Sequence, residues 1–263
     1  MTGIDIRQDG PVLRLTIDRP ESRNSMNLEM MHLLIDQVEV AGQDESVRVI
    51  ALRGAGGNFC SGADLVAKNA ATTTRPRVGS IQRRLPTQAH RLIPALLGTQ
   101  VPIVCTVSGW AAGIGFHLAL ASDFCVASST SRFWEPFLAR GFTPDSGGSW
   151  LLPRLVGMVR ARELLLLGRE LSGDEAADWG LIHRSVPDDQ LEATSEELIA
   201  RLAAAPTVAA GLTKWLLHAG TGQDLEHHLT DEAFALELSS RSLDFKEGLA
   251  AFKEKRDPHF EGR

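Results

Sequence analysis

Apolar and polar residues alternate near the start of the chain, between residues 12 and 18. Leu13, Leu15 and Ile17 fall on one face of this segment, which is typical of a half-buried β-strand. Three later segments are short and largely apolar, and each predicts a further strand. They are residues 47–54 (VRVIALRG), 101–109 (VPIVCTVSG) and 123–128 (DFCVAS).

Other segments repeat their apolar residues at the spacing of an α-helix. Asn27 is positioned to cap a helix whose apolar residues recur every three or four positions as far as Val38. Further helices are predicted over residues 80–97 and from GIGFHLALAS (113–122), and residues 172–175 (SGDE) match a capping box. Residues 68–80 are polar and weakly patterned, so we expect a loop or mobile segment there.

Strands and helices therefore alternate through most of the chain, with glycine turns closing the strands. This order is typical of an α/β fold with crossover units. After residue 186 the pattern is helical only. We expect an α/β core over residues 1–205, carrying the site, and a helical region over residues 206–263.

Composition narrows the classes of function. The net charge of −6 argues against a surface for nucleic acid or anionic membrane, although it leaves room for a local basic patch. The three cysteines lack metal-binding spacing and are interpreted as reduced packing residues of a cytoplasmic protein. The charged start of the chain predicts no signal peptide. The most apolar run, residues 101–121, is interrupted by glycines and His117, which favours strand, turn and helix over a membrane span.

Two glycine-containing turns are candidates for chemistry. GNFCSGADL (57–65) and GWAAGIGFHLALA (109–121) each follow a predicted strand. Backbone N–H groups in such turns can point at a ligand, and a helix N-terminus adds partial positive charge. Two such donors from separate turns would stabilise a developing oxyanion. From these residues alone, two ordinary tight turns are the favoured explanation, because isolated glycine motifs are weak signals.

GFTPDSGGSWLLPR (141–154) contains a single acid, Asp145, between Phe142 and Trp150. Because an apolar helix is predicted to follow, Asp145 is interpreted either as a helix N-cap or as a carboxylate placed for chemistry.

These motifs together resemble the crotonase, or enoyl-CoA hydratase/isomerase, superfamily over nearly the whole chain. The resemblance is carried by RPESRNSMN, GNFCSGADL, SGWAAGIGFHLALASD, GFTPDSGGSWLLPRLVG, LSGDEAADWGLIHRSV and FKEGLAAFKEKRDPHF. It implies a spiral of ββα turns with a helical C-terminal region, assembled as a homotrimer or a dimer of trimers. It also implies an acyl-CoA thioester substrate and an enolate held at the thioester oxygen.

The resemblance assigns the two oxyanion N–H groups to Ala63 and Ile114. The two glutamates of true hydratases are absent, because their positions are occupied by His117 and Phe137. Hydration by that mechanism should therefore be impaired. Asp145 instead matches the base of the isomerase branch, which includes isomerisation of the phenylacetyl-CoA ring epoxide and of 3-enoyl-CoA to 2-enoyl-CoA.

The remaining site residues are also assigned by resemblance. Arg23 and Lys255 match contacts to the CoA phosphates, and Asp64 and Leu65 match the adenine pocket. Ordinary solvated charges would explain the two cations as well. Phe137 is expected to contact the substrate, and His117 either contacts it or fills space on a buried helix.

His90 and Asp145 resemble the pair used by aromatic acyl-CoA dehalogenases, although those enzymes carry a tryptophan where Phe137 stands. His90 is equally explained as a helix residue that lines the acyl pocket or faces solvent. Three alternatives to the isomerase stay open. The first is a hydratase in which His117 and Asp145 position and activate water. The second is a hydrolase or dehalogenase that uses His90 and Asp145. The third is a non-catalytic acyl-CoA-binding protein. No metal or redox cofactor is implied.

Overall fold

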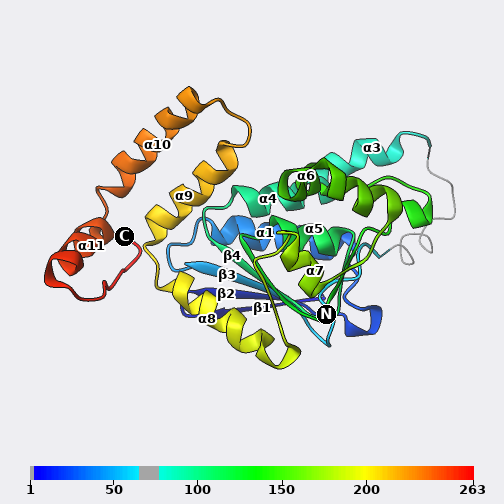
Figure 1. Ribbon diagram of the computed structural model, residues 1–263, viewed down its shortest axis with the longest axis horizontal. Helices are drawn as coiled ribbons and strands as arrows, with labels where there is room; N and C mark the ends of the chain where they lie inside the picture. Colours follow the sequence, from blue (N-terminus) through cyan, green and yellow to red (C-terminus); the bar gives the residue numbers. More distant parts are fainter. Residues whose placement is uncertain (1–2, 65–76) are drawn as a thin grey trace.

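The computed structural model describes residues 3–64 and 77–263 (Figure 1). The strands of the larger sheet are β1 (Ile4–Asp9), β2 (Val12–Ile17), β3 (Val49–Gly54), β4 (Ile103–Val107), β6 (Phe124–Ser128) and β9 (Arg184–Val186). They lie in the order β1-β2-β3-β4-β6-β9. β1 is antiparallel to β2, and every other neighbouring pair is parallel. The parallel order confirms the predicted α/β fold with crossover connections.

A second, smaller sheet carries part of the site. It consists of β5 (Trp110–Ala112), β7 (Arg132–Trp134) and β8 (Leu171–Ser172), with β7 in the middle. β5 is parallel to β7, and β8 is antiparallel to it. This small sheet therefore places the segment after β4 beside the segment after β6.

Helices cover both faces of the larger sheet (Figure 1). The helices are α1 (Leu28–Ala41), α3 (Ser80–Arg84), α4 (Leu92–Gly98), α5 (Ile114–Ala121), α6 (Gly148–Leu167), α7 (Gly173–Asp178), α8 (Leu191–Ala203), α9 (Thr207–Ala219), α10 (Leu225–Ser239) and α11 (Leu243–Glu254). Ile50 and Leu52 of β3 belong to the main core with α1, α4 and α5. Val49 and Ala51 face the other way and pack with Ile199 of α8. Both faces of this strand are buried, which accounts for its continuous apolar sequence.

Several local predictions are confirmed. The Asn27 side chain accepts a hydrogen bond from the Met30 amide at 2.9 Å and caps α1. Ser172 and Glu175 form the expected capping box at the start of α7. All three cysteines are buried and free. No helix in the described part of the chain is long and apolar enough to cross a bilayer.

One local prediction was wrong, and the edge strand β1 was not predicted. The helix expected over residues 80–97 is divided into α3, two 3₁₀ turns and α4. Pro86 lacks an amide hydrogen for a continuing helix, and Gln88 leaves helical geometry with φ −127° and ψ −113°. β1 was missed because only Ile4 of its six residues is buried, as befits an edge strand. Residues 68–76 of the expected loop lie outside the described residues.

The C-terminal helices α9, α10 and α11 extend away from the sheet (Figure 1). Lys214 of α9 nevertheless reaches the core, where its ammonium group contacts the Asp123 carboxylate at 2.7 Å and the carbonyls of Leu96 and Val101. Burial lowers the pKa of Lys214, and the charge of Asp123 opposes that shift. The division at residues 205 and 206 falls between α8 and α9 and stays a prediction.

Candidate active site

The two glycine-containing turns are joined by backbone hydrogen bonds. The Cys60 amide donates to the Trp110 carbonyl at 2.8 Å, and the Ala112 amide donates to the Cys60 carbonyl at 2.9 Å. A side chain at Gly115 would overlap the Cys60 carbonyl and lie 2.7 Å from its Cβ. Glycine at 115 therefore lets the start of α5 lie directly on the first turn.

Each turn presents a main-chain amide at this junction. Ile114 is the first residue of α5, where the N–H has no acceptor within the helix. Ala63 lies three residues beyond Cys60. The amide of the next residue, Asp64, donates a hydrogen bond to the Met26 carbonyl. Neither the Ala63 N–H nor the Ile114 N–H takes part in a hydrogen bond among residues 3–64 and 77–263. Both amides are therefore available as donors.

Ala63, Asp64 and Asp145 line one cavity of about 310 Å³. The rest of its lining comes mainly from the start of α1 and from α3 and the turns that follow it. These residues are Met26, Asn27, Leu28, Met31, Ile81, Arg84, Leu85, Gln88 and Ala89. The structure thus brings the expected acid and one expected oxyanion donor to the same cavity, although Ile114 is not among its lining residues.

Asp145 is not a helix cap. The N-cap of α6 is Gly147, and no side chain caps that helix end. Asp145 is solvent-exposed, and its Oδ1 accepts a hydrogen bond from the Ser146 hydroxyl at 3.2 Å. Its main-chain carbonyl accepts a hydrogen bond from Nε2 of His90 at 2.7 Å. The carboxylate is therefore not used to satisfy the helix end.

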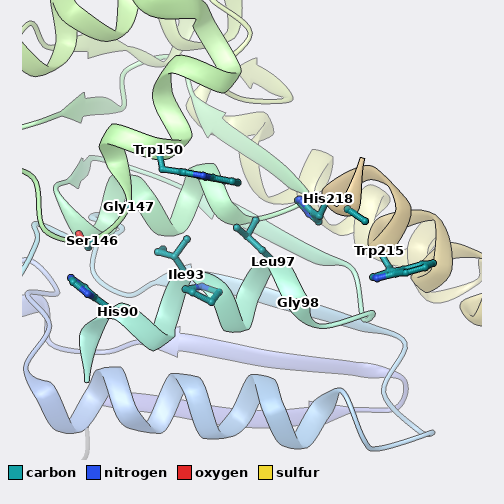
Figure 2. Close-up of a pocket in the computed structure, with 11 residues that line it drawn as sticks. His90, Ile93, Leu97, Gly98, Ser146, Gly147, Trp150, Trp215 and His218 are labelled. Carbon is teal, nitrogen blue, oxygen red and sulfur yellow. The ribbon is translucent and has the colours of Figure 1, made fainter. Parts of the chain in front are cut away.

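His90 lines a different cavity, of about 600 Å³, whose lining also includes Ser146 and Gly147. Figure 2 shows this cavity between α4, the start of α6 and α9, with Trp150 opposite Ile93 and Leu97. Trp215 and His218 reach it from α9. His90 thus holds the backbone of Asp145 instead of contacting its carboxylate.

His117 lies in the interior, with no solvent exposure. Its Nδ1 is 2.7 Å from the Ser146 hydroxyl, and its Nε2 is 2.8 Å from Oε1 of Glu135. Because both ring nitrogens have partners and the ring lines neither cavity described above, His117 contacts other side chains and not the cavity.

Glu135 is 1% exposed and follows β7. Burial raises its pKa, the adjacent His117 ring opposes the shift, and the charge of Asp145 adds to it. Its second oxygen, Oε2, has no hydrogen-bond partner among the described residues. A protonated or proton-sharing carboxyl group is the form that such an environment favours.

Phe137 is buried and stacks on the His117 ring, with ring centroids 5.9 Å apart. Phe142 meets the Phe137 ring edge-on at 5.5 Å. Phe137 therefore covers the polar group beneath it with hydrocarbon. Its expected contact with substrate stays a prediction.

Asn24 holds the first loop to the segment that leads into the turn containing Ala63. This buried side chain donates to the carbonyls of Ala55 and Asn58 at 2.8 and 2.6 Å, and it accepts from the Arg19 amide. Arg19 in turn forms an ion pair with Asp64 at 3.0 Å. Arg23 is exposed beside this anchor.

Lys255 is not brought to this cavity within one chain. It is exposed and ends α11, and α11 lies at the opposite end of the molecule from α3, which lines the cavity (Figure 1). Leu65 lies outside the described residues. In the part of the chain that the structure describes, no group of three or more His, Cys, Asp or Glu side chains is arranged to hold a metal ion.

Sequence reasoning missed Glu135, Ser146 and Asn24 as parts of the site. Glu135 had a signal, because it is an acid between Trp134 and Pro136 in an otherwise apolar segment. Its partner is 18 positions away, so only the tertiary fold reveals the pair.

Comparisons with known proteins place the chain among enoyl-CoA enzymes in sequence and in fold. The family model described as enoyl-CoA hydratase/isomerase matches residues 7–263. The chain is 38% identical over 253 residues to the 1,2-epoxyphenylacetyl-CoA isomerase of Escherichia coli, covering 96% of this chain and 95% of that one. It is also 38% identical over 249 residues to a probable enoyl-CoA hydratase of Rhodobacter capsulatus, covering 95% and 94%.

A solved structure of an enoyl-CoA hydratase subunit from Geobacillus kaustophilus superposes with a TM-score of 0.91 at 33% identity, covering 99% of this chain and 98% of that one. The fold and the motifs therefore agree over nearly the whole length. The chain belongs to the enoyl-CoA hydratase/isomerase family.

Proposed function

We propose that this protein is an enoyl-CoA isomerase that converts a 3-enoyl-CoA into a 2-enoyl-CoA. Asp145 removes a proton from C2, and the electrons move into a dienolate whose negative charge collects on the thioester oxygen. The protonated Asp145 then delivers the proton to C4, which completes the shift of the double bond. One carboxyl group serves as base and then as acid.

The observation that carries this proposal is the pairing of Asp145 with Ala63 in one cavity. The Ala63 turn is hydrogen-bonded to the turn before Ile114, which supports a shared oxyanion site for the two free amides. Donors fixed in the backbone stabilise a developing charge without reorganising. The identity with a named isomerase supports the same choice.

Hydration is less well supported, although some relatives are named as hydratases. Water attack on C3 needs a second group that positions and activates the water. His117 has both nitrogens engaged in the interior, and Phe137 presents a hydrocarbon ring. A 2-enoyl-CoA should therefore keep its conjugated absorbance in the presence of the protein, and its rapid loss would favour the hydratase.

Substitution of Asp145 tests the isomerase directly. Asp145→Asn keeps the shape of the side chain but removes the base, so kcat for a 3-enoyl-CoA should fall about 10²- to 10⁴-fold. The affinity for a non-reactive acyl-CoA, measured by calorimetry, should change little. Asp5→Asn, on the exposed edge strand, is the matched control. Unchanged turnover in Asp145→Asn would remove this residue from the mechanism.

The CoA contacts and the oligomer belong to the same proposal. Arg23 contacts the CoA phosphates beside the cavity, and Lys255 reaches them from a second copy, because α11 lies far from the cavity of its own chain (Figure 1). We propose a homotrimer, or a dimer of trimers, on the support of many exposed apolar side chains on α9, α10 and α11. These include Leu217, Leu225, Phe234, Leu236 and Phe252.

A further inference from the structure

Three interior side chains form a continuous chain of hydrogen bonds that ends on Asp145. Glu135, His117 and Ser146 are 1%, 0% and 4% exposed. Oε1 of Glu135 is 2.8 Å from Nε2 of His117, and Nδ1 of His117 is 2.7 Å from the Ser146 hydroxyl. The hydroxyl is 3.2 Å from Oδ1 of Asp145. The isomerase chemistry proposed above uses only the last of these residues.

The number of hydrogens available determines which group donates in each of these hydrogen bonds. An ionised Asp145 has no hydrogen to give, so the Ser146 hydroxyl must donate its single hydrogen to Oδ1. The hydroxyl oxygen can then only accept from Nδ1 of His117, which must carry a hydrogen. One further proton occupies the contact between Nε2 of His117 and Oε1 of Glu135. From Nδ1 of His117 onwards, each donor therefore points towards Asp145.

The position of that last proton does not change the direction. A neutral histidine with a protonated Glu135 and an imidazolium with an ionised Glu135 both leave the hydrogen on Nδ1. The pair has no net charge in either form, which suits a site without solvent. Without Glu135, Nε2 of His117 would have no partner among its described contacts, and only the Ser146 hydroxyl would still favour the hydrogen on Nδ1.

We propose that Glu135 and His117 act through Ser146 as positioning residues that hold Oδ1 of Asp145 and leave Oδ2 free to take the substrate proton. This inference rests on the proposed role of Asp145 as the base. A fixed carboxylate loses less freedom on reaching the transition state than one that rotates.

The surroundings keep the three side chains in place. They come from α5, from the segment after β7 and from the turn before α6. Phe137 stacks on the His117 ring. Gly148 lies against the pair so closely that an added Cβ would meet Nε2 of His117 and lie 3.0 Å from Oε1 of Glu135. Close packing therefore holds these hydrogen-bonded side chains in their positions.

The first experiment observes the tautomer without using activity. In protein labelled with ¹⁵N-histidine, NMR of the ring nitrogens should show a hydrogen on Nδ1 of His117 at neutral pH, with His117→Gln identifying the signal. Glu135→Met should lower the fraction of His117 that carries a hydrogen on Nδ1, whereas Glu135→Gln should keep more of it because its amide N–H can donate to Nε2. An unprotonated Nδ1 in the wild-type protein would overturn the proposal.

The second experiment measures turnover of a 3-enoyl-CoA in the same variants. Glu135→Met and Ser146→Ala should lower kcat about tenfold, equivalent to about 1.4 kcal/mol, with KM unchanged. Glu135→Gln should remain close to wild type, and this rescue separates positioning from packing. Thermal unfolding shows whether each variant is folded. If Glu135→Met does not fold, Ser146→Ala, which is the smallest change, still tests the proposal.

The outcomes separate this inference from the function on which it rests. An active wild-type protein whose Ser146→Ala variant turns over equally fast would overturn the positioning role and leave the isomerase intact. An inactive wild-type protein would overturn the isomerase, and with it the catalytic meaning of the chain, while the NMR signal of Nδ1 would still decide whether the hydrogen bonds run as described.

Discussion

Gly148 shows how a residue without a side chain can determine a site. As the first residue of α6, it places the helix backbone against the buried pair of His117 and Glu135. Any larger residue would push the helix start away from the pair or displace the His117 ring. The requirement is for space and not for unusual backbone geometry.

We therefore expect Gly148→Ala to destabilise the fold by about 1–3 kcal/mol, as overpacking in a core does, and to reduce isomerase turnover. Denaturant unfolding and kinetics would measure the two effects. Gly98→Ala is the matched control, because that helical glycine is exposed and an added Cβ there meets nothing within 4 Å. Equal stability of the two variants would contradict the close contact at Gly148.

At the scale of elements, a buried cation helps to fasten α9 to the core. Lys214 contacts the Asp123 carboxylate and two main-chain carbonyls between α4 and β4. The same carboxylate accepts the Ile103 amide at the start of β4 at 2.8 Å. One ion pair thus joins the helical region to the middle of the sheet.

Lys214→Met should cost about 3–5 kcal/mol of unfolding free energy, because it leaves a largely buried carboxylate without its cation. Hydrogen exchange should show the loss most strongly in α9. Lys253→Met, at an exposed position of α11, controls for loss of a lysine elsewhere in the helical region. Unchanged protection of α9 in Lys214→Met would mean that packing alone holds the helix.

The sequence predicted most of the helices and strands but fewer of the contacts between them. Alternation and caps were enough for β2, α1 and α7, because those signals lie within a few neighbouring residues. β1 was not predicted, because an edge strand needs few apolar residues. The contact between Glu135 and His117 was not predicted, because the two side chains meet only when β7 and α5 are folded. The identity of Asp145 as a candidate base came from the resemblance, since the residues around it fit a helix cap equally well.

At the scale of the whole molecule, the C-terminal helices expose several large apolar side chains. Phe252 is 84% exposed and Leu225 is 72% exposed. Burying such side chains against another copy would gain about 25 cal/mol for each Å² removed from water. This supports assembly through α9, α10 and α11.

Light scattering of the wild-type protein should therefore give the mass of a trimer or hexamer of the 28.5 kDa chain. Phe252→Glu should shift the mass towards the monomer by placing a charge in the buried contact. Val40→Glu, at an exposed apolar position of α1, should leave the assembly unchanged. A monomeric wild-type protein would contradict the proposed assembly.

The three buried thiols have a practical consequence. Cys60, Cys105 and Cys125 are at most 2% exposed, and burial raises the pKa of Cys60 to about 12. Burial keeps the three thiols away from maleimides, and the thiolate that attacks these reagents is scarce at Cys60 in the native fold. A cysteine introduced at the end of α11 would be the preferred site for a fluorophore, so energy transfer could follow how that helix approaches a neighbouring chain without first removing the native sulfur atoms.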